Sequence, residues 1–297
     1  MNEPTHAAMQ ATLSFGWLLG GLLLVLVAAR LVAELVWRIG QRGVAPVSRR
    51  VSSLWGRQRL SHWIARRFPR CAAFIAARVS TDRFTGLPLT LCILLASYLA
   101  SIGTDLAEDV IEQESIVQLD QQINTALSFL REPHFLDLFA GITGLANLET
   151  LVAVTLVSAA FLWADRRSRY IPGLILTVAG SQIIAYIGKY AIDRPRPDFL
   201  TFATAATPSF PSGHATGAIA VYGFIAYAIT RDVPSARLRF ELGFWAGVLI
   251  AMIAFSRAVL SVHFASDIAA GLVVGGFWLI AGFALTEVLR QRASMRL

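Results

Sequence analysis

Residues 242–288 decide the fold, and they read LGFWAGVLIAMIAFSRAVLSVHFASDIAAGLVVGGFWLIAGFALTEV. Two mostly apolar runs, 242–261 and 266–288, flank a short polar stretch. Each run is as long as the helix of about 20 residues that crosses a bilayer. Because backbone polar groups find no water in lipid, we expect both runs to be helices. A tight turn carrying His263 should join them.

The same pattern recurs along the rest of the chain. Five further apolar runs of spanning length are 13–36, 86–103, 137–163, 171–191 and 214–230. Of the 297 residues, 56% are hydrophobic and only 15% are charged, whereas charged residues make up about a quarter of a soluble domain. The sequence therefore predicts an all-α fold, a polytopic membrane bundle of helices.

Arginines set the expected orientation of this bundle. Four basic segments lie between or beyond the spans: 38–83, 166–169, 231–239 and 290–296. Seven alternating spans put all four on one side, and the positive-inside rule assigns that side to the cytosol. The net charge of +7 thus reflects topology, so we expect the lipid bilayer and no nucleic acid as a partner.

The predicted organisation has four parts. Residues 1–37 form an extra N-terminal transmembrane helix, 38–85 a basic cytosolic or interfacial segment, 86–289 the membrane domain, and 290–297 a basic cytosolic tail. In the second part, arginines alternate with apolar side chains, which favours a helix on an anionic leaflet over an unstructured linker. These side chains are Trp55, Trp63, Ile64, Phe68 and Phe74.

An acidic segment, 104–134, falls on the non-cytosolic side. It carries the acidic residues Asp105, Glu108, Asp109, Glu112, Glu114 and Asp120. Apolar residues such as Ile111, Val117 and Ile123 are spread among them. The segment is either an amphipathic lid or a solvated connector.

Three cations stand at the non-cytosolic ends of the predicted spans: Lys189, Arg196 and Arg257. Ionisable groups are costly at such places and are functional candidates by default. Three converging cations would hold a phosphate dianion, with arginine giving bidentate geometry and lysine a point charge. Lys189 is the single lysine among 26 basic residues, which argues against a simple anchor.

Two histidines and a helix start complete the candidate site. Ser212 and Gly213 open a predicted helix, whose free N–H groups favour an anion. His263 and Asp267 are one helical turn apart, so the carboxylate can orient the imidazole and leave its other nitrogen as a nucleophile. His214, on another helix, can act as the general acid.

We expect four nearby polar residues to support the structure of the site. We expect Asp193, Arg194 and Asp198 to make local ion pairs and caps rather than to contact substrate. Ser256 should hold Arg257 or the following loop by a hydrogen bond.

Lys-x6-Arg-Pro, Pro-Ser-Gly-His and Ser-Arg-x5-His-x3-Asp, as they stand here, resemble the three-part signature of the type 2 phosphatidic acid phosphatase (PAP2) family. The resemblance covers about residues 86–289 and implies a six-helix core, to which residues 1–37 add one transmembrane helix. It implies a phosphohistidine at His263, oriented by Asp267, with His214 protonating the leaving group and then activating water. It implies neither metal nor cofactor. The implied phosphate-binding residues are Lys189, Arg196, Ser212, Gly213 and Arg257.

The expected function is hydrolysis of a lipid phosphate or diphosphate at the periplasmic face of a bacterial inner membrane. Similar bacterial proteins act on undecaprenyl diphosphate, phosphatidylglycerol phosphate, phosphatidic acid or lipid A phosphates. One alternative keeps the site but passes the phosphoryl group to a lipid or sugar acceptor. Another is a non-enzymatic scaffold or transporter, which the complete set of signature residues disfavours.

Overall fold

The computed structural model describes residues 20–21, 23–41, 66–80, 83–113, 115–197 and 207–295. The chain divides into two compact units, Met1–Ser61 and His62–Leu297. In the first unit, residues 20, 21 and 23–41 are helical. Glu34 and Arg38 form an ion pair of 2.5 Å on that helix. The first residues of the predicted span 13–36 lie outside the described part of the chain.

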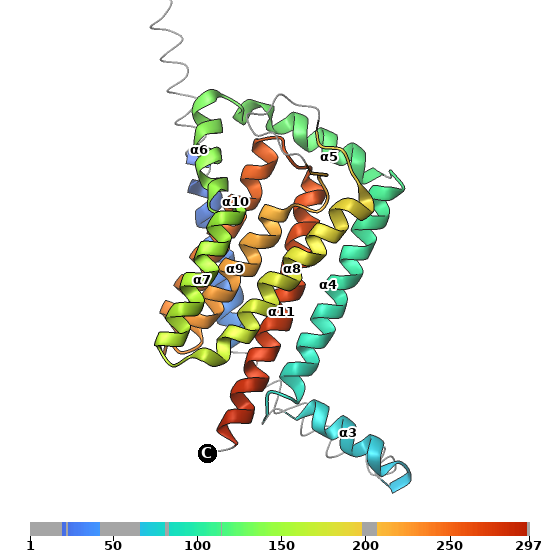
Figure 1. The fold of residues 1–297 in the computed structure, drawn as a ribbon, viewed down its shortest axis with the longest axis vertical. Coiled ribbons are helices and arrows are strands. Elements are labelled where there is room, and N and C mark those ends of the chain that lie inside the picture. The colour runs from blue at the N-terminus through green and yellow to red at the C-terminus, as the bar shows by residue number, and fades with distance from the viewer. Residues whose placement is uncertain are drawn as a thin grey trace, which may run out of the picture. The chain divides into compact units, whose positions relative to one another are not determined.

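The second unit is a bundle of helices (Figure 1). Their bounds are α3 Pro69–Val79, α4 Leu87–Ile111, α5 Ser115–Ala126, α6 Pro133–Gly144, α7 Leu148–Ala164, α8 Ile171–Ile192, α9 Gly213–Thr230, α10 Ala236–Val259 and α11 Ala265–Ser294. Among the described residues, five helical stretches are long and apolar enough to cross a membrane. The predicted all-α membrane bundle is confirmed.

Local sequence explains where several helices begin. Proline occupies the first turn of α4, α6 and α8, where its missing N–H costs no hydrogen bond. The Ser212 and Ser235 side chains cap α9 and α10 by accepting from N–H groups of the first turn. At the start of α11, the Phe264 N–H donates to Asp267 Oδ2 at 2.9 Å.

Helix α11 is central to the unit and packs against α8, α9 and α4 (Figure 1). Close approach depends on glycine: a Cβ on Gly282 would stand 2.5 Å from the Gly173 carbonyl oxygen of α8. Side chains such as Leu174 and Phe224 are fully buried between the helices. Large apolar side chains also point outward, as Trp163 does with 72% of its surface exposed. Such an exposed apolar exterior suits contact with lipid.

The predicted span 137–163 falls within the candidate membrane span Pro133–Ala164, but it is not one uninterrupted helix. The structure begins this stretch at Pro133 and interrupts it after Gly144, so that α6 and α7 are separate helices. The turn between them contains Asn147, the N-cap of α7. The apolar pattern runs through Leu145 and Ala146 without a break, which is why the pattern predicts one helix.

The acidic segment 104–134 is also mostly helical. It comprises the last turns of α4, then α5 and a short 3-10 turn at Leu127–Leu130. Helix α5 crosses the end of the bundle in Figure 1. Asp120 on this helix is only 2% exposed, so the segment is not merely a solvated connector.

The opposite end of the unit is rich in arginine. One ion pair, Arg167–Asp232 at 2.5 Å, links the α7–α8 connection to the α9–α10 connection. Two more link the α9–α10 connection to α11: Arg231–Glu287 at 2.7 Å and Arg290–Asp232 at 3.2 Å. Helix α3 lies near the start of α4 and has no buried residue. Phe68 and Phe74 are exposed there, while Trp55, Trp63 and Ile64 lie outside the described residues.

Candidate active site

The structure brings the eight predicted site residues together at the end of the bundle away from the arginine-rich connections. Lys189 is in the last turn of α8, and Arg196 is in the extended segment that follows. Arg257 is in the last turn of α10. His263 lies in the turn before α11, and Asp267 in the first turn of α11. Ser212, Gly213 and His214 form the start of α9.

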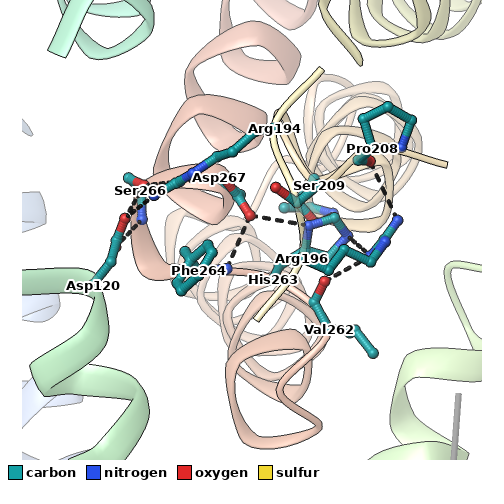
Figure 2. A network of polar contacts seen from close by, with 12 residues as sticks. Asp120, Arg194, Arg196, Pro208, Ser209, Val262, His263, Phe264, Ser266 and Asp267 are labelled. Carbon is teal, nitrogen blue, oxygen red and sulfur yellow. Dashed lines mark hydrogen bonds and ion pairs between the residues drawn. The ribbon is translucent and has the colours of Figure 1, made fainter. Parts of the chain in front are cut away.

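The environment of His263 fixes its expected tautomer. Its Nδ1 lies 3.4 Å from Asp267 Oδ2, and both side chains are almost fully buried. Its Nε2 lies 3.3 Å from Arg196 Nη1 (Figure 2). Because arginine is only a donor, this contact favours an unprotonated Nε2, and the Asp267 carboxylate favours Nδ1–H on the other side of the ring. The ring is thus arranged with a free lone pair on the side of Arg196.

Burial also controls the ionisation of His263. Desolvation lowers its pKa from 6.5 to about 4, and the nearby Arg257 and Arg196 act in the same direction, whereas Asp267 opposes them. Neutral imidazole, the form with a nucleophilic nitrogen, therefore prevails at neutral pH.

His214 and Arg257 each have a polar partner near the junction of α6 and α7. His214 Nε2 lies 3.0 Å from Asn147 Oδ1. Arg257 Nη1 donates to Thr143 Oγ1 at 2.8 Å, and the guanidinium is buried. The break in the predicted span thus supplies both side chains with a polar contact.

Lys189 and Arg196 hold the segment that precedes α9. Lys189 Nζ donates to the Pro208 carbonyl at 2.7 Å. Arg196 donates through Nε to the Thr207 carbonyl at 2.8 Å and through Nη1 to the Val262 carbonyl at 2.6 Å. Lys189, Arg196 and Arg257 all lie near enough to act electrostatically on His214. Three cations therefore surround the two imidazoles, as a phosphate site requires.

Ser212 connects the start of α9 to the start of α11. Its N–H donates to the Asp267 carbonyl at 2.9 Å, and its Oγ accepts from the Ala215 N–H at 3.5 Å. Close approach of α11 to this point requires Gly271, where a Cβ would stand 2.5 Å from the Ser212 carbonyl oxygen. Ser256 does not hold Arg257 or the loop, because its Oγ donates to the Ile253 carbonyl at 2.6 Å within α10.

The expectation of local pairing for Arg194 is wrong. Its guanidinium pairs with Asp267 Oδ1 at 2.6 Å and Asp120 Oδ2 at 2.9 Å, residues that are far away in sequence (Figure 2). Asp193 does cap α8, in a left-handed conformation with φ of 49°, and Asp198 lies outside the described residues. Asp120 offered one sequence signal, because a charge on the apolar face of an amphipathic helix is unusual.

An apolar groove of about 590 Å³ leads to this site between α7 and α8. Its walls include Leu148, Leu151, Ile183 and Ile187, and its inner end includes Lys189, Gly213 and His214. Leu148 and Ile183 are more than half exposed on the outside of the bundle. The groove therefore connects the lipid-facing surface with the cations and with His214.

Comparisons with known proteins show what this chain is similar to. The model of the PAP2 superfamily matches residues 170–290, the range that holds all eight site residues. Phosphatidylglycerophosphatase B of Bacillus subtilis is 28% identical over 176 residues, which are 58% of this chain and 87% of that protein. The crystal structure of a transmembrane PAP2-type phosphatidylglycerolphosphate phosphatase from Bacillus subtilis is 27% identical, with a TM-score of 0.59 over 63% of this chain and 94% of that chain. Aquifex aeolicus LpxE has a TM-score of 0.43 at 22% identity, over 57% of this chain and 93% of that chain.

Apolar spanning helices and a buried cationic site at their end thus define an integral membrane phosphatase, a hydrolase of phosphoric esters. Within that class, residues 170–290 match the model of the PAP2 superfamily, and the chain is similar to a transmembrane PAP2-type phosphatase of known structure.

Proposed function

We propose that this phosphatase hydrolyses the phosphate or diphosphate headgroup of a membrane lipid through a phosphohistidine at His263. The observation that carries the lipid assignment is the apolar groove, which begins among lipid-facing side chains and ends at Lys189 and His214. An acyl or prenyl chain would lie in the groove while the headgroup reaches the cations. The relative named a phosphatidylglycerophosphatase makes phosphatidylglycerol phosphate the first substrate to test.

The first chemical step follows from the contacts of His263. Its Nε2 attacks phosphorus and the bond to the leaving oxygen breaks. His214, which is protonated when the bound phosphate dianion offsets the neighbouring cations, gives its proton to that oxygen. Lys189, Arg196 and Arg257 neutralise the phosphoryl oxygens. Asp267 stabilises the charge that the ring gains, because its carboxylate faces Nδ1 at 3.4 Å.

The second step restores the enzyme. His214, now neutral, takes a proton from a water molecule that attacks phosphorus, and the N–P bond breaks. Inorganic phosphate leaves, His263 is neutral again and His214 is protonated for the next turnover. Asn147, at 3.0 Å from His214 Nε2, keeps that ring oriented through both steps.

We also propose that the site faces the periplasm of a bacterial inner membrane. The arginine-rich connections and the C-terminal end of α11 lie at the other end of the bundle, and positive loops remain in the cytosol. A green fluorescent protein fused after Leu297 should therefore fluoresce, since it folds in the cytosol. A dark fusion that is exported intact would contradict this orientation.

The activity is tested by phosphate release from purified protein in detergent with a chelator present. The lipids are phosphatidylglycerol phosphate, phosphatidic acid, undecaprenyl diphosphate and a lipid A phosphate. His263→Ala should lose roughly three orders of magnitude or more, whereas His134→Ala, which alters an exposed histidine, should keep full activity. Undiminished release by His263→Ala would overturn the mechanism. Release from none of the four lipids would overturn the assignment to this substrate class.

The groove is tested separately. Ile183→Trp narrows it at a position that is 57% exposed, while Ile175→Trp places the same bulk at a position on α8 that is 56% exposed and does not line the groove. Ile183→Trp should raise KM for a long-chain lipid phosphate several-fold and leave a short-chain soluble analogue unchanged. Equal effects of both variants on both substrates would exclude the groove as the chain-binding site.

A further inference from the structure

A buried ion network lies on the side of Asp267 that faces away from His263 (Figure 2). Arg194 Nη1 donates to Asp267 Oδ1 at 2.6 Å and to Ser266 Oγ at 2.7 Å. The other carboxylate oxygen, Oδ2, accepts from the Phe264 N–H and faces His263. Both oxygens of Asp267 are therefore fixed, one by the guanidinium and one by the start of its own helix.

The network continues to α5. Arg194 Nη2 donates to Asp120 Oδ2 at 2.9 Å. Asp120 Oδ1 accepts from the Ser266 N–H at 2.9 Å, and its Oδ2 also accepts from the Ser266 hydroxyl. Asp120, Arg194 and Asp267 are 2%, 7% and 0% exposed. One carboxylate thus fixes both Arg194 and the residue next to Asp267, although α5 contributes nothing to the phosphate site itself.

Geometry excludes Arg194 from the phosphate. Both of its terminal nitrogens are engaged, and its guanidinium lies over the Phe264 ring at 4.3 Å. Arg196, by contrast, lies beside the Nε2 of His263, where the phosphoryl group would bind. The two arginines of Arg-Pro-Arg-Pro therefore face opposite sides of the His263–Asp267 pair.

The charge of the network suits the reaction. Two carboxylates and one guanidinium leave one net negative charge beside an imidazole that becomes positive when its Nε2 is phosphorylated. Buried charges whose hydrogen bonds are all satisfied are held rigidly, and misplacement of a reacting group by about 1 Å is worth about a hundredfold in rate.

We infer that Arg194 and Asp120 are positioning residues, which hold the Asp267 carboxylate against Nδ1 of His263 and so make α5 part of the catalytic apparatus. This inference rests on the proposed function of His263 as the nucleophile. Asp120 acts through Arg194 and Ser266, and neither Asp120 nor Arg194 binds substrate.

The kinetic test compares Arg194→Gln, Asp120→Asn and their double variant. Arg194→Gln should lower kcat about 10- to 100-fold, as loss of a supporting partner does at other sites, with KM and inhibition by inorganic phosphate changed less than about twofold. Asp120→Asn should lower kcat by a smaller factor. The double variant should be no slower than Arg194→Gln, because Asp120 acts through Arg194. The matched control is Glu112→Gln, which alters an exposed acid of the same segment and should leave kcat unchanged.

A second readout needs no turnover. Nitrogen NMR of isotope-labelled histidine reports which ring nitrogen of His263 carries the proton, and His263→Ala assigns the signal. Wild type and Glu112→Gln should show the Nδ1–H tautomer, and Arg194→Gln a mixture of the two tautomers. If wild type releases no phosphate, the proposed function fails, and this spectrum still decides the inference. If Arg194→Gln does not fold, Asp120→Asn decides both measurements.

Two results would overturn the inference. One is a kcat within twofold of wild type together with an unchanged tautomer. The other is weaker inhibition by phosphate in Arg194→Gln to the extent seen in Arg196→Gln, because that would make Arg194 a phosphate ligand.

Discussion

The close approach of α11 to the start of α9 gives the sharpest prediction, for Gly271→Ala. The added Cβ would stand 2.5 Å from the Ser212 carbonyl oxygen and 3.1 Å from the Ala215 Cβ, while ordinary contact begins at 3.4 Å. The helices must therefore separate by 3.4 − 2.5 = 0.9 Å at this point, because a backbone oxygen cannot rotate away. Overpacking of this kind costs about 1–3 kcal/mol of stability.

The same displacement should affect catalysis more than folding. The Ser212 N–H bonds to the Asp267 carbonyl, so separation at Gly271 moves His214 relative to His263 and Asp267. Because a shift of about 1 Å is worth about a hundredfold, we expect kcat for lipid phosphate hydrolysis to fall by about that factor.

The matched control is Gly276→Ala on the same helix, where the nearest atom to a new Cβ is Leu99 Cδ1 at 3.5 Å. That variant should keep wild-type kcat, and its thermal midpoint in detergent should not fall. Wild-type kcat in Gly271→Ala, or an equal loss in both variants, would refute the reasoning.

Three more predictions concern single contacts. Asn147→Ala removes the partner of His214 without removing a side-chain cap from α7, so kcat should fall roughly tenfold at an unchanged thermal midpoint; a midpoint that falls as steeply as kcat would contradict this. Thr143→Val leaves the buried Arg257 Nη1 without its acceptor and should lower the free energy of unfolding by about 1–3 kcal/mol. Denaturation in mild detergent measures this change. The control is Thr104→Val, which changes an exposed threonine of α4. Because burial lowers the pKa of His263 to about 4, its NMR signal should stay that of neutral imidazole as the pH falls from 7 to about 5, and titration near the ordinary value of about 6.5 would contradict the buried site.

The candidate site residues can be picked out in the sequence because they lie at the ends of apolar runs. His263 and Asp267 sit between two runs long enough to be helices, and Lys189 ends another run. A polar residue at such a place is visible against its apolar neighbours. The spacing of each cluster therefore locates the residue on a helix end, and topology brings the ends together.

The residues that support the site could not be identified from the sequence, because their contacts depend on how distant segments pack together. Arg194 follows the last turn of α8, and in the sequence its neighbour Asp193 is the nearest candidate partner. In the structure Arg194 is buried and forms ion pairs with Asp120 and Asp267 instead. Asn147 and Thr143 lie at the interruption between α6 and α7, which the continuous apolar pattern through Leu145 and Ala146 does not indicate. These contacts depend on tertiary packing, which cannot be predicted from the local sequence of any one segment.

The central claim is that His263 carries the phosphoryl group, and trapping of the intermediate tests it most directly. The protein would be mixed with a radiolabelled lipid phosphate, quenched with denaturant at alkaline pH within the first turnover, and digested. We predict label on the peptide that contains His263, stable to alkali and lost in acid as a phosphorus–nitrogen bond is, and no label in His263→Ala. Label that persists in His263→Ala, or rapid turnover by wild type with no labelled protein at any time, would contradict the account.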